Sequence, residues 1–170
     1  MLGWKTRFPL LPQQARDIEG AMTQLTPHFA LYEFLSSETA ARMGREIVPT
    51  PEQAQNIRRL CETLLEPIRV KLERAMVVTS GLRPDWLNVA IGGAAKSAHM
   101  DGLAADIKIV GMSPATFCRW VRSNGFAVDQ CIEEFGQWSH LSIPASDAKP
   151  RNEYLIATRR DGATHYEVMP

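Results

Sequence analysis

The stretch SAHMDGLAAD, residues 97–106, places His99 and Asp106 seven positions apart and leads into a β-branched run. That run, ADIKIV at residues 105–110, alternates in the manner of a strand, with alanine and isoleucine side chains on one face. We therefore predict a strand whose apolar side chains face a core, with Asp106 projecting from the opposite face of the sheet. The glycine and alanines around it leave room for the backbone or a ligand to approach.

A second strand further along the chain carries another histidine. In WSHLSI, residues 138–143, alternation places Trp138 and His140 on one face. If the polar faces of the two strands line one cleft, His140 lies near Asp106. Two imidazoles and one carboxylate are the ligands that zinc takes when a fourth position stays open, and such a centre promotes amide hydrolysis. Each residue alone has an ordinary structural explanation, so the predicted zinc site depends on His99, Asp106 and His140 together.

Helical and hairpin patterns surround these strands. A capping box at residues 50–53 begins a helix whose apolar residues recur every three or four positions as far as Ile68. Ser113 and Pro114 begin a second helix, which Gly125 ends. We also predict a strand at 76–80, a long loop at 81–98, and hairpins at 129–143 and at 153–169, the last turning at Asp161-Gly162. These elements predict an α+β domain built on an antiparallel sheet, with helices packed mainly on one side.

Length, composition and charge bound what the chain can do. Its 170 residues, 45% of them hydrophobic, suffice for one core, and we place an N-terminal arm at residues 1–27 and the domain at residues 28–170. Lysine plus arginine and aspartate plus glutamate number 19 each, so no excess charge draws the chain to nucleic acid or to an anionic membrane. No apolar stretch approaches the roughly 18 residues of a membrane span. Three separated cysteines indicate buried apolar side chains and not a thiolate metal site.

The ordered motifs resemble those of a known enzyme family. The pattern Ser97-x-His99-x-x-Gly102-x-Ala104-x-Asp106, followed by Trp138-x-His140-x-Ser142, is similar to the zinc D-alanyl-D-alanine carboxypeptidases and the phage L-alanyl-D-glutamate endolysins. More narrowly, it resembles the small stand-alone members found in phages and prophages. HFALYEF, TSGLRPDWLN and DQCIEEF extend the resemblance over roughly residues 28–143. It implies the fold shared by hedgehog proteins and DD-peptidases.

The resemblance also implies roles for particular residues. It places zinc on His99, Asp106 and His140. It further implies that Arg83, in the loop after the first strand, binds a carboxylate of the substrate peptide. A planar guanidinium pairs bidentately with a carboxylate, which suits such a clamp. An exposed arginine in a turn is the equally ordinary alternative.

The position that carries the general base in related enzymes differs in this chain. Better-known members carry an acid three positions before the last histidine, where this chain has Gln137. Glu133 and Glu134 remain as candidates, and resemblance to the phage branch, in which the glutamate directly before phenylalanine serves, favours Glu134. Hairpin geometry leaves both open. A two-residue Gly136-Gln137 turn places Glu133 opposite His140, whereas a turn one residue longer places Glu134 there.

We therefore expect a zinc-dependent peptidase that hydrolyses peptide bonds in peptidoglycan stem peptides, as a carboxypeptidase or as an L-alanyl-D-glutamate endopeptidase. The alternative is a non-catalytic wall-binding or phage virion structural module on the same fold, which Gln137 motivates. No nucleic-acid or membrane partner is expected, and other phage proteins are candidate partners of the N-terminal arm. Without a recognisable signal peptide, the protein is expected to be made in the cytoplasm and to reach the cell wall after phage-mediated release.

Overall fold

The structure is a computed structural model that describes residues 23–146 and 148–170. Most of the arm predicted at residues 1–27 therefore lies outside the described residues. Near its end, β1 (Gln24–Thr26) pairs with β2 (Phe29–Ala30) in a small separate sheet, and most of β1 is buried. The start of the described chain thus packs against the domain.

Two short helices and one long helical column follow. They are α2 (Leu31–Phe34), α3 (Glu38–Arg42), α4 (Pro51–Leu60), the π-helical segment η1 (Cys61–Leu65) and α5 (Glu66–Leu72), of which the last three are continuous. The predicted capping box is confirmed, because Thr50 and Gln53 exchange backbone-to-side-chain hydrogen bonds. The wider π turn ends at Leu65, two residues before Pro67, whose ring lacks an amide hydrogen and would crowd the carbonyl four residues earlier in a regular helix.

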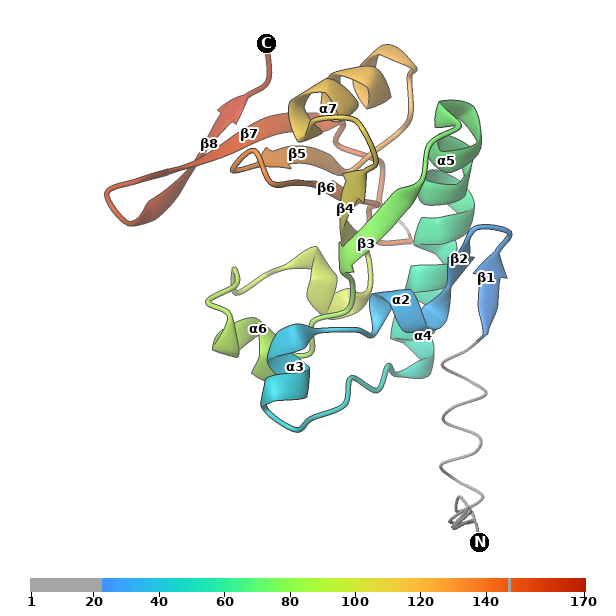
Figure 1. The fold of residues 1–170 in the computed structure, drawn as a ribbon, viewed down its shortest axis with the longest axis vertical. Coiled ribbons are helices and arrows are strands. Elements are labelled where there is room, and N and C mark those ends of the chain that lie inside the picture. Colours follow the sequence, from blue (N-terminus) through green and yellow to red (C-terminus); the bar gives the residue numbers. More distant parts are fainter. Residues whose placement is uncertain (1–22, 147) are drawn as a thin grey trace, which may run out of the picture.

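Six strands form the central sheet, in the order β3-β4-β6-β5-β7-β8 (Figure 1). They are β3 (Met76–Ser80), β4 (Ala104–Ile109), β5 (Gln130–Glu134), β6 (Trp138–Ser142), β7 (Glu153–Arg160) and β8 (Ala163–Val168). Neighbouring strands run antiparallel except β5 and β7, which run parallel. The prediction of an antiparallel sheet is therefore corrected to a mostly antiparallel one. The exception arises because the segment after β6 carries the chain back past the start of β5.

Helix α7 (Pro114–Ser123) packs against the central strands, above β5 and β6 in Figure 1. Ser113 caps it as predicted, since its hydroxyl accepts the Thr116 amide hydrogen. Helices and sheet share one apolar core, whose fully buried members include Phe29, Phe34, Ile57, Leu64, Ile107, Phe117 and Leu141. The three cysteines are free and buried, as predicted. Among the described residues no helix is long and apolar enough to cross a bilayer.

The segment predicted as a long loop, residues 81–98, is partly helical. It contains α6 (Asp85–Ala90), and the short 3-10 helix η2 (Ala98–Asp101) begins at its end. Pro84 fixes the backbone before α6, and Leu87 is the one fully buried aliphatic side chain of that helix. A helix of six residues has too few apolar positions to show a helical period, which is why the pattern indicated a loop.

The C-terminal hairpin forms as its turn residues predict. Arg160 pairs with Ala163 across a two-residue turn, in which Asp161 and Gly162 have φ angles of 51° and 78°. Positive φ at both positions matches the type I′ turn that asparagine or aspartate followed by glycine favours. The hairpin joins the sheet only through β7, so it depends on the parallel β5–β7 pairing.

An ion pair at the start of β7 should stabilise this attachment. Arg151 donates to Asp129 from Nε at 3.0 Å and from Nη2 at 2.6 Å. The Arg151 side chain is 50% exposed, so solvent screening limits the effect. We expect Arg151→Ala to lower the free energy of unfolding by about 0.5–1 kcal/mol at pH 7, measured by urea denaturation.

The same ion pair predicts a pH dependence. Its hydrogen bonds from Arg151 lower the pKa of Asp129 in the folded state. The stabilisation is therefore complete above the unfolded-state pKa of about 3.9 and is lost as pH falls through the lower folded value. The difference between wild type and Arg151→Ala should shrink accordingly in acid. Arg160→Ala, which breaks an exposed pair with Glu167, should have little effect at either pH.

Candidate metal centre

Two of the predicted ligands face each other across neighbouring strands. Asp106 on β4 is the direct antiparallel partner of His140 on β6, so both side chains project from the same face of the sheet. The prediction that they share a face is confirmed. The same line of partners continues through Ile132 on β5, Leu155 on β7 and Val168 on β8. We call these five residues the metal row.

His99 reaches the metal row from a separate turn. It lies in η2, which ends at Asp101, three residues before β4 begins. Its Nδ1 lies 2.7 Å from the carbonyl oxygen of Gly81, and its own carbonyl accepts the Arg83 amide hydrogen at 3.0 Å. The loop after β3 therefore fixes both the ring and the backbone of His99. Sequence reasoning missed the contact with Gly81, because a backbone carbonyl has no side-chain signature.

Helix α4 holds the same turn from another side. Gln53 Nε2 donates to the Met100 carbonyl at 2.8 Å, and Asn56 Nδ2 donates to the Asp101 carbonyl at 2.9 Å. Gly102 ends the turn with a φ of 72°, and a Cβ there would lie 2.7 Å from the carbonyl oxygen of Gln53. Only glycine suits both this backbone conformation and this close approach. The glycine of the motif thus allows the histidine turn to pack on α4.

Three potential ligand atoms converge where these elements meet. His99 Nε2, Asp106 Oδ1 and His140 Nδ1 are each 3.1 Å from the other two, and all three residues are buried. Tetrahedral zinc ligands at about 2.0–2.1 Å from the metal are roughly 3.3 Å apart, so this spacing suits a single ion. Within residues 23–146 and 148–170, no other group of histidine, cysteine and carboxylate side chains has this geometry.

The hydrogen-bond chemistry of this cluster favours a cation at its centre. Because a carbonyl oxygen only accepts, the contact with Gly81 assigns the proton of neutral His99 to Nδ1. Its Nε2 then presents a lone pair to the Asp106 carboxylate and to His140 Nδ1. If both imidazole rings are neutral, the three converging atoms together carry at most one hydrogen, which would be on Nδ1 of His140. A metal ion bound by all three would satisfy their lone pairs together.

Burial and neighbouring charges favour the protonation states that a metal needs. Burial lowers the pKa of His99, although the adjacent Asp106 carboxylate opposes this change. Burial alone would raise the pKa of Asp106, but the neighbouring His99 and His140 outweigh it and hold that pKa well below its usual range. A neutral His99 ring beside an ionised Asp106 carboxylate gives two of the forms that ligate metal ions. These two residues are therefore in forms that suit a cation near neutral pH.

The β5–β6 hairpin has a register different from both predicted ones. Ile132 is opposite His140, and Glu134 pairs with Trp138. Both predicted registers, which placed a glutamate directly opposite His140, are therefore wrong. The loop consists of residues 135–137, and its first two residues adopt left-handed backbone conformations with φ angles of 57° and 70°. The Gln137 amide donates to the Glu134 carbonyl at 2.9 Å, so Phe135 and Gly136 are the central residues of a turn with two positive φ angles, where phenylalanine is unusual.

Glu134 nevertheless lies on the face of the cluster, two residue pairs beyond the metal row. Alternation along β5 places it on the same side as Ile132. Trp138 Nε1 donates to Glu134 Oε2 at 2.9 Å. Burial, and then the nearby charge of Asp106, raise the pKa of Glu134. A carboxylate with a raised pKa is suited to accept and return a proton near neutral pH.

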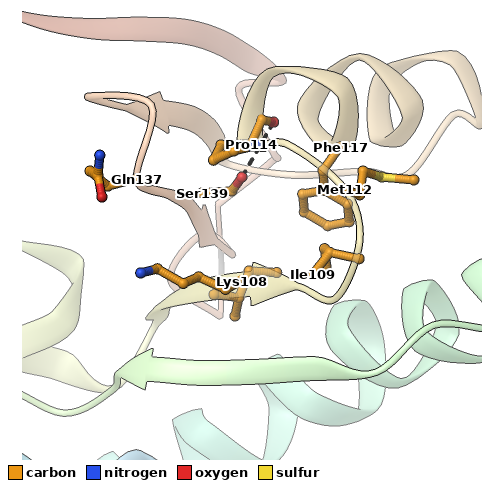
Figure 2. Close-up of a pocket in the computed structure, with 8 residues that line it drawn as sticks. Lys108, Ile109, Met112, Pro114, Phe117, Gln137 and Ser139 are labelled. Carbon is orange, nitrogen blue, oxygen red and sulfur yellow. Dashed lines mark hydrogen bonds between the residues drawn. The ribbon is translucent and has the colours of Figure 1, made fainter.

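The other two candidate positions for the base lie elsewhere. Glu133 pairs with Ser139 on the opposite face, and its carboxylate accepts the Gly136 amide hydrogen. Gln137 borders a hollow of about 130 Å³ between the end of β4 and the start of α7, which Ser139 also lines (Figure 2). Of these three side chains, only that of Glu134 shares a strand face with the cluster.

Arg83 contacts the cluster directly. Its Nη2 donates to Asp106 Oδ2, and its Nε donates to Ser80 Oγ at 2.9 Å. The Arg83 side chain is only 16% exposed, and its ion pair leaves the other carboxylate oxygen, Oδ1, facing the two histidines. Within the described part of the chain, Arg83 Nη1 has no hydrogen-bond partner. Binding of a substrate carboxylate by Arg83 stays a prediction.

An α+β domain with a buried His-Asp-His group on one face of its sheet has the features of a metalloenzyme. A sequence model of the Peptidase M15 family matches residues 27–142, and the chain belongs to this family of metallopeptidases. The family resemblance inferred from the motifs is thereby confirmed, and membership implies the hedgehog/DD-peptidase fold. No curated protein matches the chain. The matched span ends with β6, so the β7–β8 hairpin lies outside it.

Proposed function

We propose that this protein is a zinc-dependent peptidase that hydrolyses peptide bonds in the stem peptides of peptidoglycan. The observation that carries this proposal is the convergence of three buried potential ligand atoms on the sheet face that also carries Glu134. Membership of the Peptidase M15 family supports peptide hydrolysis. The resemblance to wall carboxypeptidases and to L-alanyl-D-glutamate endolysins supports stem peptides as the substrate class.

The cluster residues and their neighbours have different roles in the proposed reaction. His99, Asp106 and His140 would hold the zinc ion. When bound, zinc supplies Lewis acidity, which lowers the pKa of a water molecule and polarises the substrate carbonyl. Glu134 accepts the proton of the attacking water and passes it to the leaving amine nitrogen. Trp138 fixes one oxygen of Glu134 through its indole N–H, which leaves the other oxygen for proton transfer.

Arg83 has two roles in this proposal. Its ion pair with Asp106 holds the carboxylate so that one oxygen faces the histidines. Its free Nη1 group binds a carboxylate of the substrate peptide, since a guanidinium offers donors in several directions at once. The same side chain thus positions a metal ligand and orients the substrate.

The proposed site of action is the cell wall, which the protein reaches after phage-mediated release from the cytoplasm. The arm at residues 1–27 is the proposed contact for other phage proteins. Both statements rest on resemblance to the phage branch of the family. They concern delivery of the enzyme and not its chemistry.

Purified peptidoglycan and muropeptides test the proposed activity. The zinc-loaded protein is expected to release new peptides, whose masses distinguish removal of a terminal D-alanine from cleavage between L-alanine and D-glutamate. Treatment with EDTA should abolish the reaction and added zinc should restore it, because the ligand set suits zinc. Unchanged muropeptide masses after incubation with zinc-loaded protein would contradict the proposal.

A non-catalytic wall-binding or phage virion structural module is the second candidate function. Gln137 favours it, since better-known relatives carry an acid at that position and an amide cannot accept the proton of water. The fold alone does not fix activity. Tight binding of muropeptides without cleavage by the zinc-loaded protein would support the module instead of the enzyme.

A further inference from the structure

The C-terminal hairpin extends the sheet face on which the cluster lies. Glu134 on β5 is the partner of Ala157 on β7, and Ala157 is the partner of Tyr166 on β8. With Trp138 on β6, these residues form a second line across four strands, next to the metal row. The hairpin also projects past the tip of the β5–β6 hairpin (Figure 1). Residues outside the family's matched span therefore border the candidate catalytic carboxylate.

An open hollow of about 500 Å³ lies at the end of this second line. Phe135, Trp138, Thr158 and Arg159 line it. The rings of Phe135 and Trp138 meet edge to face with their centroids 5.9 Å apart, and the guanidinium of Arg159 lies 5.4 Å from the Phe135 ring centre. Aromatic walls with a cation at one side suit a peptide group that is partly apolar and negatively charged.

Arg159 is the charged group of the hollow and lacks a carboxylate partner. It is exposed and has no such partner among the described residues, whereas its neighbour Arg160 pairs with Glu167 at 2.8 Å. Alternation along β7 places Arg159 on the same strand face as Ala157, the face that also carries Glu134 and Trp138. A guanidinium without a carboxylate partner, beside two aromatic rings, points to an anionic ligand.

The position of Arg159 indicates which part of a substrate it meets. Leu155 belongs to the metal row, and Arg159 is four residues further along β7. At about 3.3 Å per strand residue, the two are roughly 13 Å apart. Leu155 in turn lies two strand spacings of about 4.8 Å from His140, so the backbone of Arg159 is roughly 16 Å from that of the histidine, which corresponds to about five residues of an extended peptide. Arg83, in contrast, contacts the cluster itself, so the two arginines would meet different groups of one substrate.

We propose that Arg159, Phe135 and Trp138 form a substrate subsite for a peptide residue that carries a free carboxylate, a few residues away from the cleaved bond. This inference rests on the proposed peptidase function, since it assigns a further part of the same site. The hairpin that supplies Arg159 then contributes to the choice among stem peptides. Amidation of the recognised carboxyl group would remove the charge that Arg159 binds and leave the peptide's shape nearly unchanged.

A set of synthetic stem peptides tests the subsite when their free carboxyl groups are amidated one at a time. For the zinc-loaded wild type, amidation of one particular carboxyl should lower kcat/KM by about 10- to 100-fold, mainly through KM. In Arg159→Gln, the same amidation should have no effect. Arg160→Gln is the matched control, because Arg160 is adjacent but already paired, and it should respond as the wild type does.

Calorimetric measurement of peptide binding tests the subsite independently of peptide hydrolysis. Equal sensitivity of wild type and Arg159→Gln to every amidation would overturn the subsite and leave the peptidase proposal intact. If the zinc-loaded protein cleaves none of the peptides, the peptidase proposal fails and the affinities decide the subsite. A carboxyl-dependent loss of affinity that is absent in Arg159→Gln supports it, and equal affinities across the set overturn it.

Discussion

Asp106→Ala is expected to abolish both stoichiometric zinc binding and hydrolysis of stem peptides. The substitution removes one of three converging ligand atoms and leaves Arg83, which is only 16% exposed, without its carboxylate partner. Metal catalysis supplies several kcal/mol of charge stabilisation. At about 1.4 kcal/mol per factor of ten, its loss lowers the rate by at least about 100-fold. Metal analysis of the purified variant and mass spectrometry of digested muropeptides measure the two effects.

Asp101→Ala is the matched control for this prediction. Asp101 belongs to the same motif, but it is exposed and its contact with Asn56 uses the backbone carbonyl. We expect this variant to retain zinc and activity, whereas His99→Ala and His140→Ala should behave as Asp106→Ala does. Full zinc occupancy and normal turnover in Asp106→Ala would exclude the proposed metal centre.

Glu134→Gln is expected to retain zinc but to lower kcat by about 10²- to 10⁴-fold, the usual contribution of a positioned acid or base. The amide oxygen still accepts the indole hydrogen bond of Trp138 but cannot take a proton from water. The pKa of Glu134 is raised from its ordinary value of 4.5, and only the ionised form acts as a base. Wild-type kcat/KM should therefore increase as pH rises through this raised pKa, and the variant should lack that increase.

The Glu133→Gln variant distinguishes the roles of the two adjacent glutamates. Its side chain lies on the opposite face of the sheet, and glutamine keeps an acceptor for the Gly136 amide hydrogen. This variant should have nearly wild-type kcat and an unchanged pH profile. Loss of turnover in Glu133→Gln together with normal turnover in Glu134→Gln would reverse the assignment.

Features with a local physical cause were predictable from the sequence. The capping residues Thr50 and Ser113 and the turn at Asp161-Gly162 each act through neighbouring atoms, so short patterns reveal them. Strand alternation likewise placed Asp106 and His140 on one face. These local rules were enough to find the central strands and the two longer helices, and to predict that Asp106 and His140 share a face.

Features that depend on distant contacts or rare backbone conformations were not predictable. The parallel pairing of β7 with β5 joins strands that are separated by β6 in the chain. No residue pattern predicts this pairing. The β5–β6 register depends on a left-handed conformation at Phe135, which bulky side chains seldom adopt. The ion pair of Arg83 with Asp106 arises because the loop after β3 returns to the start of β4.

In the proposed metal centre, the metal row would link zinc binding to the alignment of the central strands during folding. A slip of one residue between β4 and β6 would turn His140 toward the core while Asp106 kept its place. A chain trapped in that arrangement would assemble at most two of its three ligands, and zinc would bind it weakly. By mass action, zinc would draw misaligned molecules toward the native pairing. The ion would then select the correctly folded product before any substrate arrives.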